Sequence, residues 1–307
     1  MEKPGSNVLI TGGTGLLGKH LTKHLLNNGY NVAYLSRSAL DRRHVKVFQW
    51  DIKSGYIEPG SIEWADYIVH LAGADISDKR WTENRKRVIR DSRVKSAELL
   101  IRKLQDTTHK VKAIISSSAV GYYGDTKDEW VDENSPPGRD FMGKTAIEWE
   151  KSIAQAKDLN LRVCILRTGI VLTKKGGALP KLAKPIKFFV GAPLGTGNQY
   201  LSWIHIDDLC NIYSKAIEDV TMEGVFNAVA PNPVTNKDFT KILAGVLYRP
   251  LLLPPISKFI LKLMLGEMAE TILMSSRISN QKIIDSGYTF QFYNLKDALE
   301  NIYKSNN

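Results

Sequence analysis

Short apolar runs alternate with helical patterns along the first half of the chain. The first run, residues 7–10, is followed by a glycine-rich segment and then by a helical pattern that ends at Gly29. Further β-type runs continue this alternation at residues 31–35, 45–49, 67–71, 111–116 and 161–166. The alternation predicts a parallel sheet covered by helices on both faces, because each crossover places a helix over the sheet.

The pattern changes after about residue 169. Loops rich in Gly and Pro come first, and mainly helical periodicity then continues to Tyr303. One more β-type run, at residues 225–230, is expected to return to the first sheet. The chain is therefore predicted to be an α/β protein with a Rossmann-type, doubly wound parallel sheet and a smaller, mainly helical C-terminal lobe. We assign residues 1–170 and about 203–232 to a nucleotide-binding domain, and about 171–202 and 233–307 to a substrate-binding lobe.

Three glycines stand three residues apart where the first strand turns into the first helix. The first allows a tight turn, the second lets the backbone approach a pyrophosphate, and the third lets the helix pack closely on the sheet. The helix N-terminus adds free N–H groups and a partial positive charge. The spacing therefore predicts a dinucleotide site. The residues expected to line it are Gly12, Thr14, Gly15, Leu16, Leu17 and Gly18.

The residues that follow the second strand favour one of the two nicotinamide dinucleotides. NAD-binding proteins usually place a carboxylate about 20 residues after the glycine loop, where it holds the ribose 2′-hydroxyl. Here Ser36, Arg37 and Ser38 occupy that place. A carboxylate would repel a 2′-phosphate, whereas the Arg37 guanidinium can pair with it and stack on adenine, so NADP(H) is the predicted cofactor. Arg42 and Arg43 either add to this pocket or are exposed loop charges.

Composition narrows the class of protein. The 307 residues are 43% hydrophobic and 24% charged, as in chains that bury a sizeable core. The two cysteines, Cys164 and Cys210, lie in separate apolar stretches, which fits a reducing, cytoplasmic compartment without a disulfide framework. The N-terminal residues lack a signal-peptide pattern. The apolar stretch 256–274 carries four charged residues, so we interpret it as an amphipathic helix pair and expect no membrane partner.

The net charge of +10 favours anionic partners. Eight cations fall between residues 79 and 95, where they form either a solvated helix face or the binding surface for a phosphate-bearing ligand. Nucleic-acid binding is disfavoured, because Trp81 is the sole aromatic residue of this stretch and no recognised nucleic-acid module is present.

The histidines do not predict a metal site. His20 and His24 share one helix face at a metal-ligand spacing, but lysines precede both and the Glu of a metalloprotease motif is absent. We expect a surface helix there. His205 is interpreted as a packed strand residue, with Asp207 or Asp208 capping the following helix.

A series of short motifs runs along nearly the whole chain. They are 11–18, 71–76, 79–81 with 92–94, 116–124, Phe141 with Trp149 and Glu150, 167–169, 202–208 and 227–231. In this order they resemble the extended short-chain dehydrogenases. Within that class the match is to the atypical epimerase-family proteins, whose C-terminal domain has no assigned function. The resemblance implies an NADP(H)-dependent oxidoreductase or epimerase that transfers a hydride to or from a small carbonyl or carbinol substrate of unknown identity.

The resemblance also implies cofactor contacts beyond the glycine loop. They are Ser36, Arg37, Asp51, Ile52, Leu71, Ala72, Gly73, Arg87, Arg93 and Ile170. The position of Arg93 on the predicted helix supports its implied contact, because a cation that faces the protein interior needs an anionic partner. Asp51 is either an acceptor for the adenine amino group or a turn carboxylate. The family counterpart of His205 lies near the cleft, so a substrate contact stays open for it, and a homodimer is open because family members are often dimers.

The chemistry of this class usually depends on a Tyr-x-x-x-Lys pair, whose phenolate takes or gives a proton. That pair is missing from the segment 140–150, where the class places it. Tyr123 and Lys127 match the spacing but lie in a glycine-containing loop, where helical alignment is not expected. Ser118 matches the substrate-polarising serine of the family, and Tyr122 and Tyr123 are each either an improvised acid or a loop-packing residue. The missing pair leaves a second hypothesis: a catalytically impaired NADPH-binding protein that regulates a partner.

Overall fold

The structure, a computed structural model, describes residues 5–38 and 45–304. Within these residues a central sheet has the spatial order β12-β8-β6-β5-β1-β2-β3-β4. Its strands are β1 (Asn7–Thr11), β2 (Asn31–Ser36), β3 (Lys46–Asp51), β4 (Tyr56–Ile57), β5 (Tyr67–His70), β6 (Ala113–Ala119), β8 (Arg162–Thr168) and β12 (Gly224–Ala228). Neighbours are parallel except for the hairpin of β3 and β4. The predicted doubly wound sheet is confirmed, and β12 returns to it beside β8.

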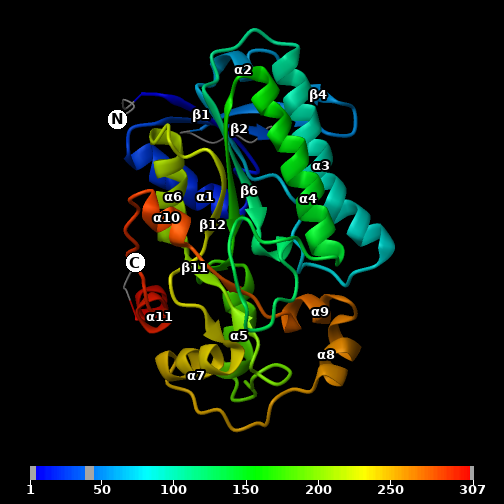
Figure 1. Ribbon diagram of the computed structural model, residues 1–307, viewed down its shortest axis with the longest axis vertical. Coiled ribbons are helices and arrows are strands. Elements are labelled where there is room, and N and C mark those ends of the chain that lie inside the picture. Colours follow the sequence, from blue (N-terminus) through cyan, green and yellow to red (C-terminus); the bar gives the residue numbers. More distant parts are fainter. Residues whose placement is uncertain (1–4, 39–44, 305–307) are drawn as a thin grey trace.

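Helices cover both faces of this sheet (Figure 1). The helices of the described residues are α1 (Leu16–Asn27), α2 (Ser61–Trp64), α3 (Glu83–Gln105), α4 (Phe141–Ala154), α5 (Ala178–Lys187), α6 (Ile206–Glu218), α7 (Asn236–Val246), α8 (Lys258–Leu265), α9 (Met268–Leu273), α10 (Gln281–Asp285) and α11 (Leu295–Lys304). Two 3₁₀ turns are η1 (Val120–Tyr122) and η2 (Gln155–Leu159). Helices α1 and α6 lie on one face of the sheet, and α3 and α4 lie on the other.

Alternation along the strands divides the core into two layers. In β1, Val8 and Ile10 join the cluster beneath α1 and α6, whereas Leu9 joins the cluster on the opposite face. This follows because successive side chains of a strand point to opposite faces of the sheet. Both cysteines are buried and unpaired.

The strand order reverses between β1 and β5. From β1 the chain adds β2 and β3 in one direction, and it then returns to add β5, β6, β8 and β12 in the other. Parallel strands leave a crevice at such a switch point, outside their carboxyl ends, because the two flanking connections leave in opposite directions. The glycine loop after β1 and the segment after β5 therefore meet at this edge.

The C-terminal lobe has its own core. Trp203, Phe239 and Leu299 belong to a third buried cluster, to which α5, α7 and α11 contribute. Short strand pairs brace this region: β9 (Ile170–Leu172) with β11 (Trp203–His205), β10 (Tyr200–Leu201) with β13 (Val234–Thr235), and β7 (Trp130–Val131) with β14 (Arg277–Ile278). The helix pair expected within residues 256–274 forms as α8 and α9. Within the described ranges no helix is both long and apolar enough to cross a bilayer.

The cap of α6 corrects one expectation. Neither Asp207 nor Asp208 caps this helix, because His205 ends β11 and its Nδ1 accepts the backbone N–H of Asp207 at 3.2 Å. Asp208 is fully buried and accepts the Tyr288 hydroxyl at 2.7 Å and the backbone N–H of Gln291 at 2.8 Å. Its carboxylate therefore ties α6 to the segment that precedes α11.

Candidate active site

The glycine loop is shaped by contacts that exclude side chains. Gly12 has φ +70°, and a Cβ atom there would lie 2.8 Å from the carbonyl oxygen of Leu71. A Cβ on Gly18 would lie 2.5 Å from the carbonyl oxygen of Gly12. The first and third glycines thus allow the tight turn and the close helix packing that their spacing predicts. Gly15 is the N-cap of α1 and supplies no side-chain cap, so the first-turn N–H groups have no side-chain acceptor.

The other residues of this loop lie at the start of α1. Thr14 is half-buried in the turn, and Leu17 packs against the core beneath α1 and α6. Leu16 faces the C-terminal part of the chain, because a Cβ on Gly176 would lie 3.3 Å from its side chain. The start of α1 therefore contacts the segment that follows β9.

A buried hydrogen-bond chain fixes the loop against β5. The Thr11 hydroxyl accepts the backbone N–H groups of Leu71 and Ala72 at 3.1 and 3.2 Å and donates to His70 Nδ1 at 2.9 Å. The proton of the imidazole is then on Nε2, which faces the Ser96 hydroxyl of α3 at 3.3 Å. Burial lowers the pKa of His70 to about 4, so the ring is neutral at pH 7. No motif in the sequence indicates this role of His70.

Arg93 is a half-buried cation beside the same edge. Its Nη1 donates to the carbonyl oxygens of Ala74 and Ile89, at 3.1 and 2.9 Å. The guanidinium lies against Gly73, where a Cβ would be 3.1 Å from Cζ, and 5.4 Å from the Trp149 ring. Burial lowers its pKa to about 10. No carboxylate among the described residues forms a salt bridge with it, and Asp75 favours its charged form only from a distance, so the guanidinium can still pair with an anionic ligand.

The proposed phosphate-recognising residues lie at the end of β2. Ser36 closes the strand, and Arg37 is exposed just after it. Arg42 and Arg43 lie outside the described residues, so the structure leaves their two alternatives open.

The hairpin of β3 and β4 holds Asp51 in a turn. The Asp51 carboxylate accepts the Lys53 backbone N–H and the Ser54 hydroxyl, both at 3.0 Å, and these bonds lower its pKa. The turn interpretation therefore has direct support, while the carboxylate stays exposed at the edge of the sheet. Ile52 is half-buried beneath it.

The remaining predicted cofactor contacts, Arg87 and Ile170, lie in different surroundings. Arg87 is exposed on the first turns of α3 and forms no hydrogen bond or ion pair with a described residue. Ile170 begins β9, and its backbone N–H donates to the carbonyl oxygen of Ser202 at 2.9 Å. Its half-buried side chain packs against the core of the C-terminal lobe.

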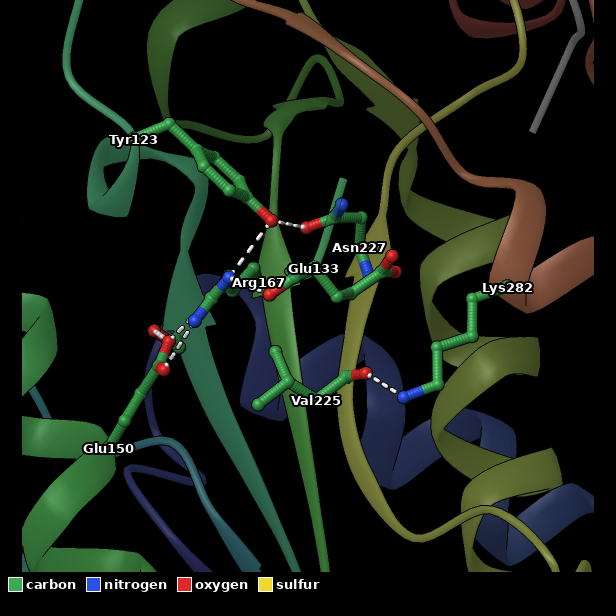
Figure 2. A network of polar contacts seen from close by, with 8 residues as sticks. Tyr123, Glu133, Glu150, Arg167, Val225, Asn227 and Lys282 are labelled. Atoms are coloured by element: carbon green, nitrogen blue, oxygen red, sulfur yellow. Dashed lines mark hydrogen bonds and ion pairs between the residues drawn. The ribbon is translucent and has the colours of Figure 1, made fainter. Parts of the chain in front are cut away.

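A buried ion pair anchors the predicted serine. The Ser118 hydroxyl, at the end of β6, donates to Glu150 Oε1 at 2.6 Å. Arg167 of β8 donates two hydrogen bonds to the same carboxylate, from Nε to Oε1 at 2.9 Å and from Nη2 to Oε2 at 2.8 Å (Figure 2). Burial alone would lower the pKa of Arg167, but the bonds to Glu150 raise it overall. The serine, the carboxylate and the guanidinium thus form one rigid charged unit.

The two tyrosines flank this unit in different ways. The Tyr123 hydroxyl is buried, donates to Asn227 Oδ1 at 2.7 Å and accepts from Arg167 Nη1 at 2.9 Å. Burial raises its pKa to about 12. Tyr122 is half-buried, and its ring centroid lies 3.3 Å from Arg167 Cζ. Glu133 completes the network by accepting the Asn227 backbone N–H at 2.7 Å (Figure 2).

No tyrosine lies on α4, where the usual pair belongs. The inner side of this helix presents Met142 and Ala146, both buried, after an N-cap formed by Asp140. Tyr123 ends a 3₁₀ turn, and Lys127 has φ +57°, so the two are not aligned on a helix. Glu150, on the same helix, is the residue that reaches the serine. Glu150 belongs to one of the motifs that carry the family resemblance, but nothing local in the sequence indicates its contact with Ser118.

The comparisons with known proteins cover almost the whole chain. Residues 8–228 match the NAD dependent epimerase/dehydratase family, and residues 256–302 match a domain of unknown function, DUF1731. This chain belongs to the NAD-dependent epimerase/dehydratase family.

Similar family members come from distant organisms. The epimerase family protein YfhF of Bacillus subtilis is 37% identical over 96% of this chain and 97% of its own length. The chloroplastic SDR39U1 homolog of Arabidopsis thaliana is 34% identical over 96% of this chain and 86% of its own. The structure of human SDR39U1 with NADPH, 29% identical, covers 97% of this chain and 99% of that one with a TM-score of 0.89. The resemblance drawn from the motifs is therefore confirmed.

The histidines noted in the sequence make local contacts. His20 Nδ1 donates to the Leu16 carbonyl oxygen at 3.0 Å, and His24 Nε2 lies 3.1 Å from the Asn28 amide. Across residues 5–38 and 45–304, no group of three or more His, Cys, Asp or Glu side chains is placed to hold a metal ion. The imidazole of His205 packs on Phe292, with ring centroids 4.0 Å apart.

Proposed function

We propose that this family member binds NADP(H) and transfers a hydride between its nicotinamide and a carbonyl or carbinol carbon of a small molecule. The observation that carries the proposal is the junction of Gly12, Gly18 and the uncapped start of α1 at the switch point of the sheet. A pyrophosphate fits there because close backbone N–H groups can approach it without a Cβ atom in the way. The human relative solved with NADPH supports the same cofactor class.

Two cations of this chain would meet the remaining charges of the cofactor. Arg37 would pair with the 2′-phosphate, and Arg93, which lacks a carboxylate partner in the described structure, would face the pyrophosphate side. The backbone of residues 71–73 is held beside the glycine loop by Thr11. Asp51, Ile52, Arg87 and Ile170 complete the proposed contacts. When bound, the cofactor supplies or accepts the hydride.

Ser118 and Glu150 would handle the proton that accompanies the hydride. Because the Ser118 hydroxyl donates to Glu150, its lone pairs are free to accept a hydrogen bond from a substrate hydroxyl. In the oxidative direction that hydroxyl passes its proton to Ser118 Oγ while the Ser118 proton moves to Glu150 Oε1. The carbon loses its hydride in the same step, which balances the reaction. Arg167 holds the carboxylate in place, and Tyr122 or Tyr123 would orient the substrate or assist as an acid.

The second candidate is a catalytically impaired NADPH-binding regulator. It is favoured by the absence of a tyrosine on α4 and by the hydrogen bonds that already occupy the Tyr123 hydroxyl. Turnover separates the two candidates: we would incubate the protein with NADPH and carbonyl probes such as phenanthrenequinone. Turnover that is lost in Ser118→Ala, with NADPH affinity unchanged, supports the enzyme. Binding of NADPH without turnover of any probe supports the regulator.

Calorimetric titration tests the cofactor proposal itself. We expect NADPH to bind more than about tenfold more tightly than NADH, since a paired phosphate contributes about 1.5–3 kcal/mol. Arg37→Asp should remove this preference, whereas Arg102→Asp, an exposed cation near the end of α3, should keep it. If neither dinucleotide binds the wild-type protein, the cofactor proposal is refuted. If the preference for NADPH is unchanged in Arg37→Asp, the role of Arg37 in binding the phosphate is refuted. The mass of the nucleotide released from purified protein gives an independent check.

A further inference from the structure

Helix α8 exposes an apolar face to solvent. The side chains of Phe259, Ile260, Leu263 and Met264 are 78%, 46%, 69% and 66% exposed. Their spacing places them along one side of the helix. The helix buries Leu261 on the opposite side. A helix that is apolar on both sides is normally covered on both, so the exposed side indicates a surface that meets something other than water.

Neighbouring segments also expose large apolar side chains. Phe188, after α5, and Leu252, in the connection from α7 to α8, are each 68% exposed. The two segments lie side by side, because the Ile256 N–H donates to the Pro193 carbonyl oxygen and the Ile256 carbonyl oxygen accepts the Gly195 N–H, both at 2.8 Å. In Figure 1 the connection and helices α5, α7 and α8 gather at one end of the molecule, the lower end of the view. We call α8 with residues 188–190 and 247–257 the apolar end.

The charged residues within the apolar end itself are all positive. Residues 239–266 contain no Asp or Glu, and neither do residues 159–206, which include α5. Lysines do occur there: Lys184 and Lys258 are exposed and form no salt bridge within the described structure. Lys262 pairs with Glu270 at 2.9 Å. Exposed aromatic and aliphatic side chains therefore stand among cations that local carboxylates leave largely uncompensated.

This combination selects among the partners that could cover the face. A second copy of the chain, docked face to face by the same surface, would bring its lysines against these lysines, which costs free energy. An anionic bilayer instead offers phosphates to the lysines and an acyl region to the apolar side chains. The charges that interrupt the stretch 256–274 predict no membrane partner from the sequence alone. In the structure those charges leave one side of α8 apolar and exposed.

We propose that the apolar end docks on the surface of a bilayer containing anionic lipids. Phe259, Leu263 and Met264 enter the interface between headgroups and acyl chains, and Lys184 and Lys258 lie at the level of the phosphates. The protein is held at the membrane surface without crossing it. Docking rests on residues separate from the glycine loop and from Ser118, so it stands or falls independently of the proposed function.

Sedimentation with lipid vesicles tests the proposal. The full-length protein is mixed with vesicles of phosphatidylcholine alone, or of phosphatidylcholine and phosphatidylglycerol in equal parts. We expect the wild-type protein to bind the anionic vesicles at least about tenfold more tightly, since each lysine near such a surface contributes about fivefold. Added salt should weaken this binding because it screens the lysines.

Paired variants separate the apolar and the charged contributions. Phe259→Ser with Leu263→Ser should lower the affinity for anionic vesicles by about tenfold or more, because each side chain loses part of its burial. Lys184→Glu with Lys258→Glu should remove the preference for anionic over neutral vesicles. The matched controls are Val220→Ser, a 70% exposed apolar residue outside the apolar end, and Arg102→Glu; both should bind as the wild type does.

Three results would overturn the proposal. The first is wild-type binding that does not depend on anionic lipid. The second is equal binding by the paired variants and their controls. The third is a dimer, detected by light scattering, that Phe259→Ser with Leu263→Ser dissociates while no vesicle binding occurs, since the face then meets a second copy. Thermal unfolding of every variant is measured alongside, and unchanged melting assigns a loss of binding to the surface.

Discussion

Replacing Glu150 by alanine should destabilise the fold far more than the same change at Glu148. Both glutamates lie on α4, and each pairs with an arginine at short range: Glu150 with Arg167 at 2.8 Å and Glu148 with Arg90 at 2.6 Å. Their surroundings differ. The side chains of Glu150 and Arg167 are 10% and 3% exposed, whereas those of Glu148 and Arg90 are 42% and 44% exposed. The comparison therefore holds helix, residue type and partner type constant, while burial and the number of hydrogen bonds to the carboxylate differ.

Burial sets the expected magnitudes. Glu150→Ala leaves the Arg167 guanidinium buried without its counter-charge and removes the acceptor of Ser118, which should cost about 3–5 kcal/mol of unfolding free energy. Glu148→Ala removes a solvent-screened pair and should cost about 0.2–1 kcal/mol. Removing both members of the buried pair, in Glu150→Ala with Arg167→Met, should cost less than Glu150→Ala alone, because no unpaired charge is then left inside.

Urea unfolding followed by circular dichroism measures these differences. The reasoning predicts that Glu150→Ala shifts the midpoint strongly, that Glu148→Ala barely shifts it, and that the double variant lies between them. If Glu150→Ala and Glu148→Ala agree within about 1 kcal/mol, the buried pair does not stabilise the fold as argued. If the double variant loses as much as the sum of its two single variants, the two side chains are not coupled.

Two further predictions concern the glycine loop and its support. Gly12→Ala should abolish tight NADPH binding in calorimetry, because its Cβ would lie 2.8 Å from the Leu71 carbonyl oxygen. Gly55→Ala pays a similar backbone cost at φ +73°, with nothing within 4 Å of its Cβ, and should bind normally; equal losses would contradict the steric argument. Burial lowers the pKa of His70 to about 4, so as pH falls from about 6.5 to 4 the unfolded chain takes up a proton that the folded chain does not. This proton uptake should lower the free energy of unfolding by about 3 kcal/mol as the pH falls: the full stability is present above pH 6.5, and this part of it is lost by pH 4. Urea unfolding at several pH values should show a shallower dependence in His70→Gln, and an unchanged slope would refute the assignment.

The fold could be predicted because its signals are local. Strand β12, which lies beside β8 in the sheet, is an example: Val225 and Phe226 form part of a short apolar run, and the parallel pairing of β12 with β8 follows from the Rossmann topology. The signal of the glycine loop is also local. Three glycines at three-residue spacing suffice to specify a tight turn, a backbone that a pyrophosphate can approach, and a helix packed closely on the sheet. The apolar face of α8 was not predictable in the same way. Periodicity indicates that a helix has an apolar side but does not indicate whether the fold covers that side.

The candidate catalytic residues show where sequence reasoning stops. Ser118 and Glu150 are 32 positions apart, and Arg167 is 17 positions further on, so their contact exists only after β6, β8 and α4 have packed. A motif can indicate that each residue matters, but it cannot indicate that the serine donates to a carboxylate rather than to a tyrosine. With Met142 and Ala146 on the inner side of α4, the polar group that this helix brings to Ser118 is Glu150. Burying a carboxylate and a guanidinium costs desolvation free energy. Three apolar side chains in place of Ser118, Glu150 and Arg167 would stabilise the fold as well. The proposed role of this unit is to leave the remaining lone pairs of Ser118 for a substrate, and NADPH turnover in Ser118→Ala is therefore the decisive assay.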